Sequence, residues 1–318
     1  MTEDYLVSIV LITYNQKNFI KEALSSSFLQ NYEPLEIIIS DDCSTDGTYD
    51  IVKEQASIYK GPHKLVLNRN SKNLGIAGNL NRAFALTKGY FIVAQAGDDI
   101  SCKERVKKIM SRFRDISCPV DLVASYFAEI DVSGNLTGFI KKDIAFTPDL
   151  TKNYREWRCG ATGACAAYNR KLFDKYGPID ADVLSEDWVY SFRAWLEAGI
   201  DVIEEPLVKH RTHEAALGFM QGNFKKCDSR TRRYRRLQGA KNRLAISREW
   251  LRGYRISGRN DLKIERQLED LVRLRKLEVD AFSANKAEAF KLALAVVKAG
   301  GNYKDMLRIV IRHVLELN

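Results

Sequence analysis

Two adjacent carboxylates follow a short apolar run in the first third of the chain. The run covers residues 91–96, and Gly97, Asp98 and Asp99 come directly after it. Such a run is typical of a buried strand that ends in a polar loop, and ligands of open α/β sheets bind beyond the carboxyl ends of the strands. Paired carboxylates suit Mg²⁺ or Mn²⁺ beside a phosphate. The residues therefore predict a metal site, and the alternative is a turn in which the aspartates cap the next helix.

Polar residues also follow three earlier apolar runs, residues 5–12, 35–40 and 64–67, which we predict to be strands. These polar residues are Thr13, Tyr14 and Asn15 after the first run, Asp41 and Asp42 after the second, and Asn73 and Gly75 after the third. Helical patterns lie between the runs, so we predict an α/β fold with a doubly wound, mostly parallel sheet. The polar residues then share one rim, where carboxylates suit a ribose, amides suit a nucleobase and a metal suits a diphosphate.

The second half of the chain adds a further acidic motif, Ser185-Glu186-Asp187, at the start of a predicted helix over 188–198. Its two acids either do chemistry or favour the positive end of the helix, with Ser185 as the cap. Further strands are predicted over 121–130, 202–203 and 206–208, with a hairpin turn at 132–135. The small-residue run 159–165 allows either close approach of a ligand or tight packing of a strand against a helix.

The composition is that of a soluble globular protein, with 45% apolar and 29% charged residues among 318. The first residues are acidic and the apolar run that follows is short, so we expect no signal peptide, and no run is long enough to span a membrane. The six cysteines form no C-x-x-C pair, which predicts reduced thiols in a cytoplasmic protein.

Positive charge is concentrated in one segment. The net charge is +9, and residues 221–260 hold 13 Lys and Arg against two acids, which is +11 and leaves −2 for the rest. A near-neutral body with one basic segment indicates a local contact with an anionic surface. A solvated helix face is the plain alternative, and we favour anionic lipid over nucleic acid because no nucleic-acid-binding motif accompanies the arginines.

The last hundred residues are predicted to be helical. The Arg-rich segment runs from 221 to 251 with breaks at Gly253 and at 257–258, and residues 262–282 have the apolar spacing of an amphipathic helix. That helix would pack on the body or on a second subunit in a homodimer. Final helices are predicted over 286–298 and 303–317. We therefore expect a domain over 1–220 and a basic helical extension over 221–318.

Several motifs together carry a family resemblance. These are VSIVLITYNQ, IIISDDCSTDGT, NLGIAGNLNRA, AGDDI, SEDW and HRTH, in that order along the chain. Over residues 5–218 the sequence resembles glycosyltransferase family 2, the inverting enzymes of GT-A fold, of the bacterial surface-polysaccharide type. The resemblance implies transfer of a sugar from a UDP- or dTDP-linked donor to an acceptor hydroxyl, with Mn²⁺ or Mg²⁺.

The resemblance also implies roles for individual residues. The nucleotide pocket would comprise Thr13, Tyr14, Asn15, Asp41, Asp42, Asn73 and Gly75. Asp98 matches the second carboxylate of the DXD motif, with Asp99 and His213 as further metal ligands and Arg211 beside the diphosphate. Asp187 matches the catalytic base, with Glu186 next to it.

One position departs from the family pattern. The first Asp of the DXD motif falls on Ala96, so metal binding would be weaker or less essential. This departure keeps open a non-catalytic relative that binds sugar or nucleotide. A nucleotidyltransferase is disfavoured, because residues 13–16 are not a Gly-rich phosphate loop with a Lys.

The resemblance and the charge together give expectations for partners and location. They imply a lipid-linked or oligosaccharide acceptor, and a cytoplasmic enzyme peripheral on the inner face of the membrane, held there by the basic helices. The runner-up hypothesis is a nucleic-acid-binding protein that uses the Arg-rich residues 230–236.

Overall fold

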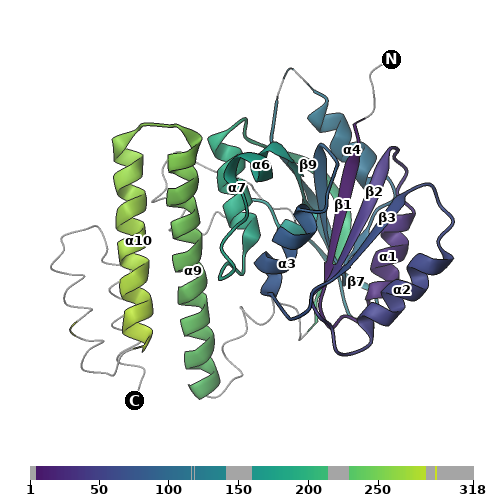
Figure 1. Cartoon of the computed structure of the whole chain (residues 1–318), viewed down its shortest axis with the longest axis horizontal. Helices are drawn as coiled ribbons and strands as arrows, with labels where there is room; N and C mark the ends of the chain where they lie inside the picture. Colours follow the sequence, from purple (N-terminus) through teal and green to yellow (C-terminus); the bar gives the residue numbers. More distant parts are fainter. Residues whose placement is uncertain are drawn as a thin grey trace.

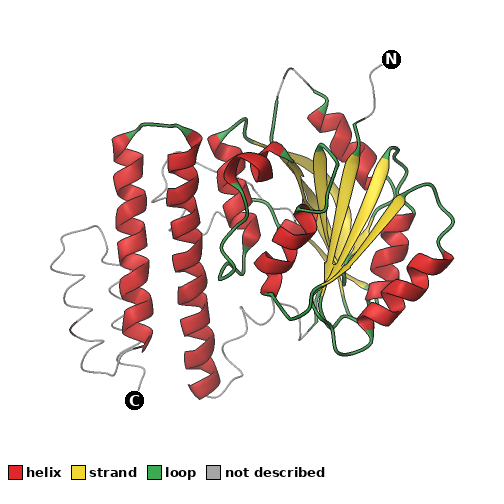
Figure 2. Cartoon of the chain, viewed as in Figure 1, coloured by secondary structure: helices red, strands yellow, loops and turns green. Residues whose placement is uncertain are grey.

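The computed structural model describes residues 5–140 except 116 and 118, residues 160–213 and 229–283, and residue 291. A curved mixed sheet lies at its centre with helices on both faces, and two long helices stand beside one of these faces (Figures 1 and 2). The predicted α/β class is therefore confirmed, as is a helical C-terminal part.

The first half of the chain forms a parallel sheet in the order β3-β2-β1-β4. Its strands are β1 (Val7–Thr13), β2 (Leu35–Asp41), β3 (Lys64–Arg69) and β4 (Phe91–Ala96). The crossover helices are α1 (Ile20–Phe28), α2 (Thr48–Ile58) and α3 (Gly75–Phe84). β1 and β2 are buried along almost their whole length, which explains why both are apolar runs without alternation.

The second half extends the sheet past β4 in mixed directions. Its strands are β5 (Ile100–Ser101), β6 (Leu122–Ile130), β7 (Leu136–Ile140), β8 (Ala166–Asn169) and β9 (Ile200–Arg211). β8 is antiparallel to both β4 and β6, while the longest ladder, between β6 and β9, is parallel. The prediction of two short strands over 202–203 and 206–208 is wrong, because one strand runs through Pro206 and only shifts its register there.

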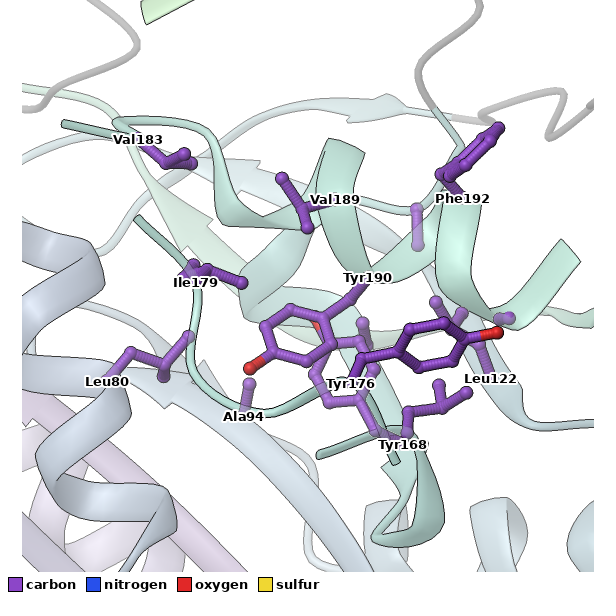
Figure 3. Close-up of a cluster of buried hydrophobic side chains, with 14 of the residues drawn as sticks. Leu80, Ala94, Leu122, Tyr168, Tyr176, Ile179, Val183, Val189, Tyr190 and Phe192 are labelled. Carbon is purple, nitrogen blue, oxygen red and sulfur yellow. The ribbon is translucent and has the colours of Figure 1, made fainter. Parts of the chain in front are cut away.

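The two faces of the sheet bury separate apolar cores. One core lies under α1, α2 and α4 (Arg105–Phe113). The other joins α3, α6 (Lys171–Tyr176) and α7 (Glu186–Leu196) to the long helices. Figure 3 shows its centre, where Tyr168, Tyr176 and Tyr190 pack together. A short 3-10 turn, Gly163–Cys165, leads into β8.

The long helices α9 (Ser229–Ser257) and α10 (Leu262–Ser283) form an antiparallel hairpin (Figure 1). The predicted break at Gly253 is wrong, because α9 runs through this residue without interruption. A β-carbon there would lie 3.8–4.0 Å from Leu196, Tyr176 and Phe192, which is ordinary contact distance. The helix ends at Ser257, before Gly258 in a left-handed conformation. Trp250 of α9 belongs to the same apolar core as α7, so the extension packs as part of the body.

Other predictions about this region have mixed outcomes. Leu268 and Leu274 of α10 are buried, as expected for an amphipathic helix, while the homodimer stays a prediction. The boundary at 220/221 and the helices predicted over 286–298 and 303–317 lie outside the described residues. None of the helices in the described ranges is both long and apolar enough to cross a membrane.

Candidate functional site

The predicted polar loops do meet at one rim of the sheet. In the parallel ladders Thr13 pairs with Asp41, and Ile12 pairs with Ala96, so β1, β2 and β4 end level with one another. These strands finish at the lower end of the molecule in Figure 1. The sequence argument placed the polar residues there because parallel strands share one carboxyl edge.

Asp41 and Asp42 are buried and held in fixed positions at the end of β2. The backbone N–H of Ser44 donates to Asp41 Oδ1 at 3.0 Å, and Arg69 lies 3.5 Å from the same oxygen. Asp42 Oδ1 accepts hydrogen bonds from the Asn70 side chain and from the backbone of Leu74, both at 2.8 Å. Within the described residues, Asp41 Oδ2 is a buried acceptor without a donor, as expected for a carboxylate that awaits a ligand hydroxyl or water.

A buried amide network that the sequence analysis missed supports Asp42. Asn79 Oδ1 accepts from Ser40 Oγ at 2.6 Å and from Asn70 at 2.9 Å, and Asn68 donates to both Ser40 and Asn70. Buried polar side chains that satisfy one another in this way fix a single arrangement. The only sequence signal was a group of asparagines that follows β3 and reaches into α3.

The first loop packs tightly against the turn that carries Asp98. A β-carbon on Gly97 would lie 2.7 Å from Thr13 Oγ1 and 2.5 Å from Gln16 Oε1, so only glycine fits beneath this loop. Asn15 has a positive φ of 51° and accepts a hydrogen bond from the Thr45 backbone at 2.9 Å, which ties the first loop to the second. Tyr14 is exposed at the same rim.

The Asn73 turn lies beside this pair of loops. Asn73 Oδ1 accepts from the Gly75 N–H at 2.9 Å, and Gly75 has a φ of 75° where α3 begins. The hydrogen bond from the Leu74 N–H to Asp42 holds this turn next to Asp41 and Asp42, as the family resemblance implied.

Asp98 and His213 form the second polar pair at the rim. His213 Nε2 lies 2.9 Å from Asp98 Oδ2, and both side chains are mostly buried. The His213 ring also packs on Phe19, with ring centroids 4.8 Å apart. A carboxylate with an imidazole suits Mn²⁺ or Mg²⁺ when a diphosphate supplies further oxygens. The described residues contain no cluster of three or more His, Cys, Asp or Glu able to hold a metal ion alone.

Asp99 and Arg211 are placed differently from expectation. Asp99 is buried, its Oδ1 accepts from the Arg211 backbone at 2.9 Å, and burial together with Asp98 raises its pKa well above the usual value. The Arg211 guanidinium is 2% exposed and donates to the Asp98, Asp131 and Val132 carbonyls and to Glu22. Arg211 therefore anchors the turn that carries Asp98. Its expected role beside a diphosphate stays a prediction.

Glu186 and Asp187 begin helix α7. A β-carbon on Gly163 would lie 2.2 Å from Glu186 Oε1, and one on Gly160 would lie 2.4 Å from Ser191 Oγ. The small-residue run thus serves close packing against α7, which decides between the two alternatives left open by the sequence. Burial in this contact, together with Asp187, raises the pKa of Glu186 to about 8.

A buried arginine that the sequence analysis missed connects the two acidic motifs. Arg105 donates to the Ala94 carbonyl of β4 at 2.9 Å and to the Ala164 carbonyl at 2.8 Å, next to Gly163. Burial raises the pKa values of Asp99 and Tyr168, and the positive charge of Arg105 partly offsets both increases. Burial also lowers the pKa of Arg105 itself. Tyr168, seen in Figure 3, lies close enough to Glu186 and Asp187 for both charges to raise its pKa further.

Solved structures resemble this chain in fold. TarS residues 1–349 of S. aureus, in complex with UDP, has a TM-score of 0.57 at 20% identity, over 90% of this chain and 74% of that one. The mannosyltransferase PcManGT from Pyrobaculum calidifontis, in complex with GDP-Man and Mn²⁺, has a TM-score of 0.55 at 19% identity, over 100% and 82%. At such identities the likeness concerns the fold, and it confirms the GT-A type of sheet.

The sequence comparison then gives the family. The model of glycosyl transferase family 2 matches residues 8–177, more than half of the chain, and the chain belongs to this family. EpsE of Bacillus subtilis, provisionally named a glycosyltransferase, is 37% identical over 102 residues, 32% of this chain and 36% of EpsE. The Escherichia coli UDP-Glc:alpha-D-GlcNAc-diphosphoundecaprenol beta-1,3-glucosyltransferase WfaP is 36% identical over 94 residues, 30% and 36% of the two chains. The aligned part is about a third of each relative.

Proposed function

We propose that this protein transfers a sugar, with inversion, from a nucleoside diphosphate donor to an acceptor hydroxyl during synthesis of a surface polysaccharide or glycolipid. The observation that carries the proposal is the level ending of β1, β2 and β4, which gathers the buried acids Asp41 and Asp42 with the Asp98–His213 pair. Such a rim offers hydrogen-bond acceptors for a ribose beside acidic and imidazole groups for a diphosphate. WfaP, by its name, uses UDP-Glc, which supports a uridine donor here.

The acids at the start of α7 are proposed to handle the acceptor proton. A base must take that proton as the hydroxyl attacks the anomeric carbon, and Asp187 has this role. Burial and the neighbouring Asp187 raise the pKa of Glu186 to about 8, so this carboxyl group mostly holds its proton at pH 7.

Asp98 and His213 are the residues that would hold Mn²⁺ or Mg²⁺. When bound, the ion stabilises the negative charge that grows on the leaving diphosphate. Asp99 and Arg211 hold the turn that carries Asp98, through the bonds from Arg211 to the Asp99 carboxylate and to the Asp98 carbonyl. Ala96, in place of the first DXD carboxylate, leaves this site with fewer acidic groups.

The test is calorimetric titration of UDP, dTDP and GDP, each with and without Mn²⁺, on wild type and Asp98→Ala. The expected result is metal-dependent binding of one nucleotide that is lost, by at least about tenfold in affinity, in the variant. Binding without turnover of any sugar donor would favour the non-catalytic relative. Failure of every nucleotide to bind would contradict the proposal.

Membrane association is proposed as a second property, carried by the position of α9. Its first turns, which contain the Arg-rich residues 230–236, lie at the same lower end of the molecule as the rim (Figure 1). Later arginines of α9 are paired with acids of α10, because Arg243 pairs with Glu278 and Arg255 with Glu265 and Glu269. Contact with anionic lipid would therefore bring the rim towards a lipid-linked acceptor.

Sedimentation with vesicles that contain anionic lipid tests this second property. Binding should fall steeply between low and physiological salt, and neutral vesicles should bind weakly. Tighter binding to single-stranded or duplex nucleic acid than to the vesicles would favour the runner-up hypothesis instead.

A further inference from the structure

We propose that Asn242 of α9 is a positioning residue that fixes the start of α7 and thereby orients Glu186 and Asp187. The inference rests on the proposed function, in which Asp187 takes the acceptor proton. It assigns part of the active-site geometry to the helical extension, outside the residues 8–177 that match the family.

The Asn242 side chain makes two hydrogen bonds to the residues just before the acidic pair. Its Oδ1 accepts from the Leu184 backbone N–H at 2.7 Å, and its Nδ2 donates to Ser185 Oγ at 3.2 Å. Asn242 is 8% exposed, and its two partners are half-buried. Both ends of one buried amide are thus used to hold the entry to α7.

Ser185 does not cap its own helix in the usual way. It occupies the N-cap position, and among the described residues its side chain makes no capping bond to the first turn of α7. An N-cap serine normally bonds to the N–H of the second or third helical residue. Here Asn242 donates to that hydroxyl from another helix, so the entry angle of α7 depends on a tertiary contact.

Two more contacts from α9 hold the residues that follow the pair. Trp250 Nε1 donates to the Trp188 carbonyl at 3.1 Å, and the two indole rings are stacked. Further along α7, the buried Arg193 pairs with Glu249 at 2.9 Å. The acidic pair therefore lies between an anchor at 184–185 and an anchor at 188, and both belong to α9.

The test compares Asn242→Leu, which is similar in size and makes no hydrogen bond, with Asn242→Asp, which keeps the acceptor. Ser247→Ala is the matched control, because Ser247 is also buried on α9 and bonds only to the Leu244 carbonyl of its own helix. Hydrogen exchange of the peptide over 183–189 is measured first. Nucleotide affinity by calorimetry and steady-state turnover of the UDP-, dTDP- or GDP-sugar that binds follow.

For Asn242→Leu we expect exchange over 184–188 to become about tenfold faster and kcat to fall by about tenfold. This factor corresponds to about 1.4 kcal/mol for the loss of the two hydrogen bonds. KM for the donor and nucleotide affinity should stay within about twofold of wild type, because the nucleotide loops do not contact Asn242 in the described structure. Asn242→Asp should recover most of the protection, since its carboxylate still accepts from Leu184. Ser247→Ala should match wild type throughout.

Equal exchange and equal kcat in Asn242→Leu and Ser247→Ala would overturn the inference. So would faster exchange spread evenly over the whole chain, which would indicate a loss of global stability instead. If wild type turned over no donor, the proposed function would fail, and local exchange would still decide whether Asn242 holds the start of α7.

Discussion

The two acidic pairs of this protein, Asp98–Asp99 and Glu186–Asp187, are held in place by different means. Asp98–Asp99 follows a central strand, and its contacts come from other parts of the same sheet, chiefly Arg211 at the end of β9. Glu186–Asp187 begins a helix on one face of the sheet, and α9 of the extension holds the residues on either side. In each pair the pKa of one member is raised, by burial and by the neighbouring acid.

This difference shows which part of the molecule holds each pair. The first pair depends on backbone and side-chain bonds from residues of the sheet. The second pair depends on a helix hairpin that packs into the same core as α7. We expect variation of the extension to affect the acceptor side of the site more than the nucleotide side.

The largest expected effect is on the proposed base itself. Asp187→Asn keeps the size of the side chain and removes its ability to accept a proton, so turnover should fall by about 10³-fold. Nucleotide affinity should be unchanged, since the nucleotide loops lie at the ends of β1 and β2. Steady-state kinetics with parallel calorimetry measure both quantities. Wild-type turnover in this variant would assign the base elsewhere.

The second effect concerns the anchor of the first pair. Arg211→Met leaves the carbonyls of Asp98, Asp131 and Val132 without their charged donor, so the free energy of unfolding should fall by about 3 kcal/mol. Glu22→Gln is the matched control, because Glu22 is the exposed partner of Arg211, and it should cost less than about 1 kcal/mol. Denaturant unfolding measures both. Similar losses in the two variants would mean that the ion pair, and not the carbonyl bonds, matters most.

A third prediction compares the two glycines that the pairs pack against. Gly97→Ala places a methyl group 2.8 Å from Thr13 Cβ, which cannot move without its strand, and should cost about 2 kcal/mol of stability. Gly163→Ala meets the flexible end of Glu186, so it should cost less than about 1 kcal/mol while it displaces that carboxyl group and lowers turnover. Thermal unfolding and kinetics of both variants test this contrast. A larger loss of stability in Gly163→Ala than in Gly97→Ala would contradict it.

The smallest effect is the pH dependence that Glu186 contributes. Its pKa is raised from 4.5 in the unfolded chain to about 8 in the folded protein, so the folded state holds the extra proton between these values. Stability from this group is therefore lost as pH rises from about 4.5 to 8. Glu186→Gln should remove that loss between pH 5 and pH 8. Denaturant unfolding at the two pH values measures it, and parallel pH profiles for wild type and variant would contradict the assignment.

Much of the first acidic region could be predicted from the sequence. Apolar runs without alternation identified the buried strands, and parallel strands must end at one edge, so Thr13, Asp41 and Asp98 had to lie near one another. His213 was assigned beside Asp98 by the family resemblance, and the structure gives their distance as 2.9 Å. The roles proposed for these residues in binding and catalysis stay predictions.

Other features could not be foreseen, for identifiable physical reasons. The sequence cannot tell a guanidinium that faces a ligand from one that the fold buries, so the bonds of Arg211 to three backbone carbonyls could not be foreseen. Gly253 was taken as a helix break because glycine is a poor helix former, while packing of the neighbouring residues of α9 into the core outweighs that preference. Arg105 and Asn242 gave no local signal, since their partners are 59 and 58 residues away in the chain.

The sequence by itself determined the alternation of strands and helices, the shared rim and the family, because these follow from local patterns of apolar and polar residues and from the geometry of parallel strands. Only the tertiary structure decided which acids are buried, which arginine anchors the Asp98 turn and which helix holds the start of α7. Those outcomes depend on contacts between residues far apart in the chain. Burial and electrostatic interaction are set by distances in space, which the fold determines.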